Sequence, residues 1–225
     1  MNILIACEES QRTCTEFRKL GHNAFSCDIL DPSGGHLSWH IKGDVRPVAL
    51  TGEFSTMDGI RHHCNWDLII AHPPCTYLTN SGNRWFSIER YGDKAKERYH
   101  LRDEAVEFFM FFTRLDCPHI AIENPIGYMS TYYRKPDQII QPYMFGDPER
   151  KSTCLWLKKL PPLYPTNVVA PEIIAYKNGC GTDSKWHMDT IKLPPAERAR
   201  VRSLTFPGIA KAFATQWTKY LEEII

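Results

Sequence analysis

Short apolar runs alternate with amphipathic stretches along the first half of the chain. Four runs have the length of buried strands, and they cover Asn2–Ala6, Ala24–Cys27, Trp66–Ala71 and His119–Ile122. Apolar residues recur at helical spacing elsewhere, which predicts a helix over Gln11–Leu20 with Ser10 as its N-cap, and another over residues 100–115. This alternation predicts an α/β fold, with a parallel sheet covered by helices on both faces.

The second half of the chain differs from the first half in composition and in hydrophobic periodicity. Residues 158–195 are rich in Pro and Gly and show little periodicity, whereas Gly208 to about Leu221 carries an apolar helical face. Pro194-Pro195 precedes another expected helix over Ala196–Ser203. We therefore expect three parts: a domain at 1–157, a small insert at 158–194, and C-terminal helices at 195–225 that pack back on the domain.

The composition narrows the protein class. The chain has 225 residues, with 43% hydrophobic and 24% charged residues, which is ordinary for a soluble globular protein and unlike a disordered, fibrous or membrane protein. The first residues lack the features of a signal peptide, and the run Ala105–Phe112 is too short to span a bilayer. We expect a cytoplasmic protein whose eight cysteines are reduced. His62-His63-Cys64 has no matching ligand pair nearby, so we expect no metal site.

Charge is distributed unevenly although the formal net charge is only +1. Residues 131–202 hold twelve Lys and Arg against seven Asp and Glu, whereas residues 1–75 hold six against nine. A basic insert suits a polyanion lying across it, and a solvated surface with an incidental excess explains the counts equally well.

Polar or reactive residues follow each predicted strand at the point where it stops. They occur in the loop after Ala6, at Asp28, at His72 to Cys75 and at Glu123-Asn124. Ligands of open parallel sheets bind beyond the carboxyl ends of the strands. These four places are therefore the candidate site.

Cys75 is the strongest candidate for chemistry. Two prolines precede it and hold it in a rigid turn, although cysteines in such proteins are commonly small buried hydrophobes. A carboxylate at the next strand end, Glu123, would lie close to it; the alternatives are that Glu123 caps a helix or pairs with an arginine. Together a thiol and a carboxyl suit attack on an electron-poor ring, in which the thiolate adds to carbon and the carboxyl bonds a ring nitrogen.

In chain order these motifs resemble those of the DNA cytosine-5 methyltransferases, in particular short phage and prophage forms. Pro74-Cys75 matches the family's nucleophile motif, Glu123-Asn124 matches the pair that holds the flipped cytosine, and residues 208–217 resemble the closing helix. The resemblance implies a Rossmann-like class I methyltransferase sheet, S-adenosylmethionine as cofactor, and DNA as partner. An amino-methyltransferase motif has similar spacing at His72–Cys75, but it carries an acidic or Asn residue first and an aromatic residue last.

The resemblance also assigns a cofactor site. Asp28 matches the acidic residue that binds the ribose, and Asp44 matches the residue that contacts the adenine. The family's glycine-rich loop is absent, and Glu8 or Glu9 there could face the methionine amino group. The expected cofactor-binding residues are Glu8, Glu9, Ser10, Asp28, Ile29, Asp44, Val45, His72 and Pro73.

The implied mechanism begins with a base flipped into the pocket. Cys75 adds to C6 of cytosine, and Glu123 donates to N3, which requires a raised pKa of this carboxyl. The family's Gln-x-Arg-x-Arg motif is missing, so Arg150 or Lys151 substitutes for it. The expected catalytic residues are Cys75, Glu123, Asn124, Arg150 and Lys151.

The small insert leaves the substrate open. Residues 158–194 must serve for target recognition, and RNA or a free cytosine nucleotide are alternatives to DNA. A non-catalytic DNA-binding relative is a third possibility, because the cofactor loop and the arginine motif are altered. Within the insert, Trp186 and His187 either touch a base or anchor the lobe.

Overall fold

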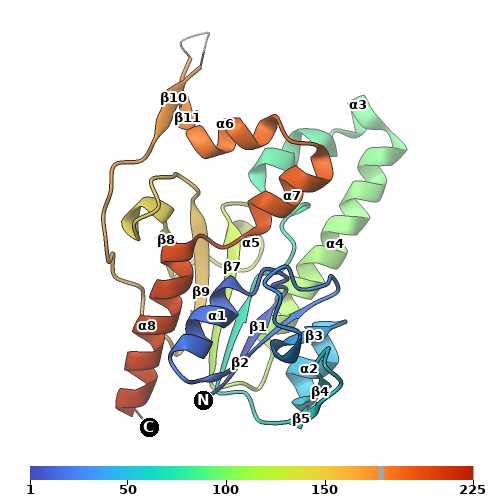
Figure 1. Ribbon diagram of the computed structural model, residues 1–225. Coiled ribbons are helices and arrows are strands. Elements are labelled where there is room, and N and C mark those ends of the chain that lie inside the picture. Colours follow the sequence, from blue (N-terminus) through green and yellow to red (C-terminus); the bar gives the residue numbers. More distant parts are fainter. Residues whose placement is uncertain (177–179, 225) are drawn as a thin grey trace.

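A seven-stranded sheet forms the centre of the protein. The computed structural model describes residues 1–176 and 180–224, so residues 177–179 of the predicted insert and residue 225 lie outside it (Figure 1). The strand order across the sheet is β3 (His40–Lys42), β2 (Asn23–Asp28), β1 (Asn2–Ala6), β6 (Leu68–Ala71), β7 (His119–Pro125), β9 (Thr153–Lys158) and β8 (Gln138–Ile140).

Five neighbouring strands, from β3 to β7, run parallel to one another. The next strand, β9, is antiparallel to both of its neighbours. Ala6 pairs with Cys27 on one side and Ala71 on the other, and Ala71 pairs with Ile122. The carboxyl ends of β2, β1, β6 and β7 therefore lie at one edge. This arrangement confirms the predicted Rossmann-like α/β class.

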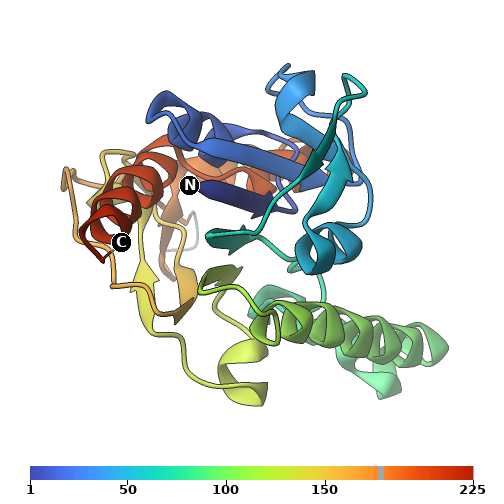
Figure 2. The same ribbon diagram turned by 90° about the horizontal axis from the view of Figure 1, so that it is seen from below.

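Helices cover both faces of this sheet (Figures 1 and 2). On one face α1 (Arg12–Lys19) and α8 (Pro207–Ile224) bury Phe17, Phe213 and Trp217 against it. On the other face lie α2 (Val45–Thr51) and α4 (Asp93–Thr113), and Phe109 and Phe112 of α4 are fully buried there. Burying each such side chain contributes about 1.5–3 kcal/mol. This burial stabilises the packing of the helices on both faces of the sheet.

Short elements complete the chain. They are η1 (Leu37–Trp39), β4 (Glu53–Ser55), β5 (Arg61–His63), η2 (Asn80–Phe86), α3 (Ile88–Tyr91), α5 (Met129–Tyr132), η3 (Pro142–Met144), β10 (Ile173–Ala175), β11 (Thr182–Ser184), α6 (Lys185–Ile191) and α7 (Pro195–Ser203). Figure 1 shows β10, β11, α6 and α7 as a lobe beyond the carboxyl ends of the sheet strands. Within the described residues, every helix is too short or too polar to cross a bilayer.

Most predicted elements are present, with shifted ends. All four strands form, and the helix predicted at 100–115 begins earlier, at Asp93. The expected Ser10 cap is wrong. Gln11 is the N-cap residue, with φ of 58°, and its side chain makes no capping hydrogen bond. Instead the buried Glu8 carboxylate accepts hydrogen bonds from the first-turn amides of Thr13 and Cys14, at 2.7 and 3.1 Å. A carboxylate there also complements the positive end of the helix dipole.

Candidate active site

Cys75 lies just beyond β6, in a loop that is bound tightly to β7. The buried Asn124 side chain donates from Nδ2 to the carbonyl oxygen of Pro73 at 2.8 Å. Further along, the amide of Tyr128 donates to Leu78 O at 2.7 Å. The loops after the two strands therefore form one unit, with the exposed Cys75 on it.

Gly127 permits this close approach. A Cβ at this position would lie 2.0 Å from the carbonyl oxygen of Leu78, far inside van der Waals contact. Any other residue would push the loop that follows Cys75 away from β7. Glycine is the residue that allows two backbones to meet in this way.

Glu123 is held by a histidine from the neighbouring loop. His72 Nδ1 donates to Glu123 Oε2 at 3.1 Å, and the two side chains are only 7% and 17% exposed. Burial raises the pKa of Glu123, but the hydrogen bond from His72 and the positive charges of Lys151 and His72 outweigh it. The pKa lies below its ordinary value. The expected raised pKa is therefore wrong for the free protein, because His72 and Lys151 stabilise the charged form.

The pKa of the Cys75 thiol is shifted in the opposite direction, above its ordinary value. Desolvation by the surrounding atoms and the negative charge of Glu123 raise its pKa, whereas the positive charge of Lys151 lowers it. The strand pairing explains why these charges act on the thiol, since the end of β6, the end of β7 and the start of β9 lie side by side. In the free protein the cysteine is a thiol and the glutamate a carboxylate.

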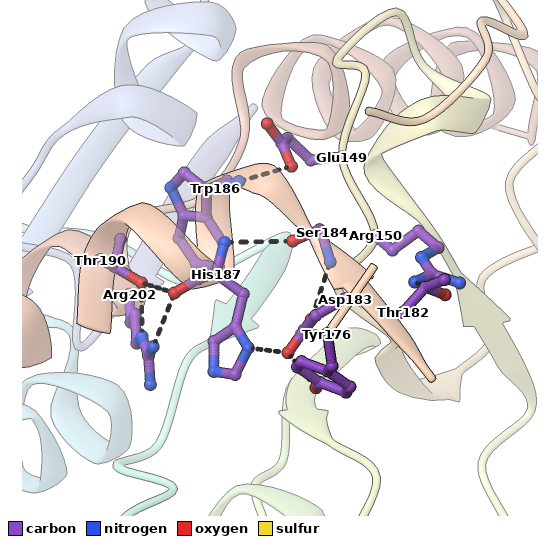
Figure 3. Close-up of polar contacts among 10 residues, drawn as sticks. All are labelled: Glu149, Arg150, Tyr176, Thr182, Asp183, Ser184, Trp186, His187, Thr190 and Arg202. Carbon is purple, nitrogen blue, oxygen red and sulfur yellow. Dashed lines mark hydrogen bonds and ion pairs between the residues drawn. The ribbon is translucent and has the colours of Figure 1, made fainter. Parts of the chain in front are cut away.

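Lys151 and Arg150 are separated by the structure. Lys151 Nζ donates to the carbonyl oxygen of Arg202 at 2.9 Å and lies 5.9 Å from the ring centre of Phe206. Arg150 instead reaches away and donates from Nη2 to Thr182 Oγ1 of β11 at 3.1 Å (Figure 3). Adjacent residues of an extended segment point to opposite sides, and of these two cations Lys151 is the one whose charge acts on the thiol.

The lobe that supports Lys151 has its own polar framework, drawn in Figure 3. Arg202 donates from Nη2 to His187 O at 3.1 Å and from Nε to Thr190 Oγ1 at 2.9 Å, which joins α7 to α6. Trp186 packs edge-on against Phe206, with ring centres 5.2 Å apart, so it anchors the lobe. His187 Nδ1 pairs with Asp183, which also accepts from the hydroxyl of Tyr176 at 2.9 Å and from the amide of Ser184 at 2.8 Å.

The carboxyl ends of the first three strands form a second cluster. Burial raises the pKa of Cys7, and the negative charge of Asp28 raises it further, with Cys27 and Asp44 adding to the effect. These groups therefore lie near one another. Cys7 has φ of 60° and occupies a left-handed conformation that glycine adopts more readily.

Glu8 and Glu9 take different roles in this cluster. Both oxygens of Glu8 bind the amides that begin α1. Glu9 Oε2 accepts from the amide of Ser33 at 3.3 Å, and its Oε1 is buried without a hydrogen-bond partner among the described residues. Ser10 Oγ accepts weakly from the amide of Arg12 at 3.5 Å.

Asp28 and Asp44 differ in their availability. Burial raises the pKa of Asp28, whose Oδ1 accepts from the amide of Leu30 at 3.0 Å. Beside it the apolar side chain of Ile29 is 73% exposed. Asp44 is engaged by Arg46 at 2.7 Å, a contact that holds its pKa below the ordinary value, and Val45 after it is a core residue.

The sequence indicated some members of the site and missed others. Gln11 is fully buried and closes the loop after β1, since it bonds both the amide and the carbonyl of His36 at 3.0 and 2.9 Å. Arg202 and Phe206 position Lys151. No sequence pattern indicates these contacts, because they join distant segments. For the hydrogen bond between His72 and Glu123, the sequence offered one indication: both residues lie at the ends of predicted strands.

Comparison with known proteins finds similarity in solved structures and not in family models or curated proteins. No family model matches this sequence, and neither does any curated protein. One solved structure, described as a "putative DNA modification methyltransferase" encoded within a prophage (E. coli), aligns with 76% of this chain at 15% identity and a TM-score of 0.45. The aligned part is 52% of that protein, so this chain spans about half its length. At such identity the similarity concerns the fold alone, and the fold class rests on the strand order described above.

Proposed function

We propose that the protein transfers a methyl group from S-adenosylmethionine to C5 of cytosine in DNA, through a covalent bond from Cys75 to C6. The observation that carries the proposal is the placement of Cys75, Glu123 and Lys151 at adjacent strand ends: β6 pairs with β7, the start of β9 pairs with the end of β7, and Asn124 of β7 binds the turn before Cys75. A nucleophile, a carboxyl for the ring nitrogen and a cation for the thiolate are the groups this reaction needs. The resemblance of the Pro-Cys and Glu-Asn motifs to the cytosine-5 methyltransferases supports the same reaction.

The reaction requires the reverse of the resting protonation states. Cys75 must be a thiolate, and Glu123 must carry a proton toward N3 of the base. In the free protein the thiol keeps its proton and the carboxyl is ionised. One proton must therefore leave Cys75 and one must reach Glu123, so base binding need not change the total charge of the pair. Lys151 stabilises the thiolate once it forms.

The neighbouring side chains have supporting roles. Asn124 fixes the turn before Cys75 through the carbonyl of Pro73. His72 orients Glu123, and we propose this role for it in place of direct contact with the cofactor. After methylation a base must remove the C5 proton while the thiolate leaves. Arg150, which binds the lobe, has no direct part in these steps.

The strand ends beside β1 fit S-adenosylmethionine. The buried, unpartnered Oε1 of Glu9 suits an ammonium group, the carboxyl of Asp28 suits ribose hydroxyls, and the exposed Ile29 suits an adenine ring. When bound, this cofactor supplies the electrophilic methyl group. We assign Asp44 and Ser10 to the same site as further cofactor contacts, whereas Glu8 holds α1 in place.

We assign DNA contact to the lobe formed by β10, β11, α6 and α7, which we call the basic lobe. Exposed lysines and arginines here would neutralise phosphates, which makes binding depend on salt. DNA in a bacterial cell, of host or phage, lies in the cytoplasm, which is the compartment we propose. Methylation of RNA or of a free nucleotide is an outcome that the test below separates.

The test is transfer of label from S-adenosylmethionine to mixed-sequence DNA, both as duplex and as separated strands, with RNA and dCMP as parallel substrates. We expect label on C5 of cytosine with the native protein and none with Cys75→Ser, while both proteins bind the cofactor. Label on the exocyclic amine, or full transfer by Cys75→Ser, would overturn the mechanism. Label in RNA or dCMP alone would move the proposal to that substrate.

A further inference from the structure

Arginine and aromatic side chains interleave on a surface beside Cys75. They come from η2 in the loop after β6, from α4, and from the segment after β7 that includes α5. We name this group the Arg–aromatic surface, and its members are Trp85, Arg98, Tyr99, Arg102, Tyr128 and Tyr132.

Arg102 joins both active-site loops. Its guanidinium carbon lies 4.1 Å from the ring centre of Phe86, in η2, and 4.3 Å from that of Tyr128, after β7. A third ring, Tyr99 on its own helix, is 4.7 Å away. Its Nε is buried and has no hydrogen-bond partner among the described residues. Cation–π contacts with these three rings therefore help to hold this arginine in place.

Arg98 makes similar contacts one helical turn earlier. It donates from Nη2 to the carbonyl oxygen of Thr76, the residue after Cys75, at 3.1 Å. Its guanidinium carbon is 4.9 Å from the ring centre of Tyr77 and 5.0 Å from that of Phe86. The two arginines thus fix the aromatic rings close to the catalytic cysteine.

Several of these rings present faces to solvent. Trp85 is 42% exposed and lies 4.8 Å from the guanidinium carbon of Arg84. Tyr132 is 52% exposed and stacks on Tyr128 with ring centres 5.5 Å apart. Exposed aromatic side chains serve as stacking platforms for the bases of single-stranded nucleic acid.

The charge of this region favours bases over phosphates as its ligand. Residues 76–134 contain eight Lys and Arg and eight Asp and Glu, so the segment has no excess positive charge. Affinity for a duplex comes largely from phosphate neutralisation, and paired bases show only their edges. Unpaired bases expose the ring faces that Trp85 and Tyr132 can stack against.

We propose that the Arg–aromatic surface stacks the bases of an unpaired strand that flanks the base entering at Cys75. The proposal rests on the proposed function for the position of the target base, and it names a substrate that is single-stranded around that base. Strand choice would then come from stacking, while the basic lobe supplies phosphate contacts.

The test measures binding of a fluorescent mixed-sequence oligonucleotide, alone and annealed to its complement, by anisotropy without cofactor. The native protein should bind the single strand more tightly. Trp85→Ala and Tyr132→Ala should each weaken that binding about 5- to 100-fold, the loss expected for one stacked base. The matched control is Tyr164→Ala, because Tyr164 is 73% exposed and lies away from this surface, beside Gln216 of α8.

Equal or tighter duplex binding, or unchanged single-strand affinity in Trp85→Ala and Tyr132→Ala, would overturn the proposal. The proposed function is judged separately by methyl transfer. Loss of single-strand binding in the variants, together with absence of transfer to any cytosine, would leave the surface standing and remove the enzymatic proposal. Methyl transfer to duplex DNA at the same rate in the native protein, Trp85→Ala and Tyr132→Ala would support the enzymatic proposal and remove the proposal for the surface.

Discussion

Replacing His72 tests whether this residue sets the ionisation state of Glu123. In His72→Leu the hydrogen bond to Glu123 Oε2 is lost, while burial and Lys151 remain. A hydrogen bond to a charged group contributes about 1.5–3 kcal/mol. The acid dissociation constant of Glu123 should therefore fall about 10- to 100-fold. His72→Gln, which can still donate, should show a smaller change.

We also expect His72→Leu to alter how the free energy of unfolding depends on pH. The folded-state pKa of Glu123 is lowered, so this group stabilises the protein above the ordinary pKa of glutamate. That contribution is lost as the pH falls through the folded pKa. His72→Leu should thus lower the free energy of unfolding most at neutral pH, and the two proteins should converge in acid.

Carbon-13 NMR of the glutamate carboxyls measures the titration, with the Glu123 signal assigned by Glu123→Gln. The control is His119→Leu, since His119 lies at the other end of β7 and bonds the carbonyl oxygen of Asp67. If Glu123 titrates at the same pH in His72→Leu as in the native protein, the ionisation argument is refuted.

Three further predictions concern the thiol, the loop and the core. Lys151→Met should raise the pKa of the Cys75 thiol, because it removes the cation that favours the thiolate; alkylation by iodoacetamide should shift to higher pH. Gly127→Ala should displace the loop through its clash with Leu78 O and abolish methyl transfer, while cofactor affinity is retained in calorimetry. Trp217→Ala should lower the free energy of unfolding in urea by about 3–5 kcal/mol, since this fully buried ring fills the space under α8.

Matched changes control these three experiments. Arg150→Met removes a neighbouring cation that points to the lobe and should leave the alkylation profile unchanged. Gly59→Ala alters a glycine with open space around it, although its φ of 86° brings strain of its own, and should not change transfer. Thr215→Ala lies on the exposed side of α8 and should cost little stability. Equal effects of a test and its control would contradict the reasoning.

The sequence predicted the parts of the fold that depend on local pattern. The apolar runs of β1 and β6 and the stripe of α8 are each buried in the structure. The antiparallel course of β9 was not predicted, because strand direction depends on long-range pairing with β7. The brief edge strand β8 has too few residues to produce a pattern.

The predicted positions of the candidate site residues follow from strand order, whereas their detailed interactions depend on contacts between distant segments. The rule that ligands bind at carboxyl strand ends correctly brought Cys75 and Glu123 together. The expectation that burial raises the pKa of Glu123 was wrong, because His72 and Lys151, which lower this pKa, come from other parts of the sheet. In the same way the assignment of Glu8 ignored the unpaired amides of the helix that follows it.

The most direct test of the account is to trap the bond to Cys75. A DNA strand with 5-fluorocytosine in place of cytosine should form a complex that survives denaturation in the presence of S-adenosylmethionine, because fluorine at C5 cannot leave as the proton does. Mass spectrometry should place the adduct on Cys75, and Cys75→Ser should form none. Methyl transfer that proceeds without any adduct, or an adduct on another residue, would contradict the central claim.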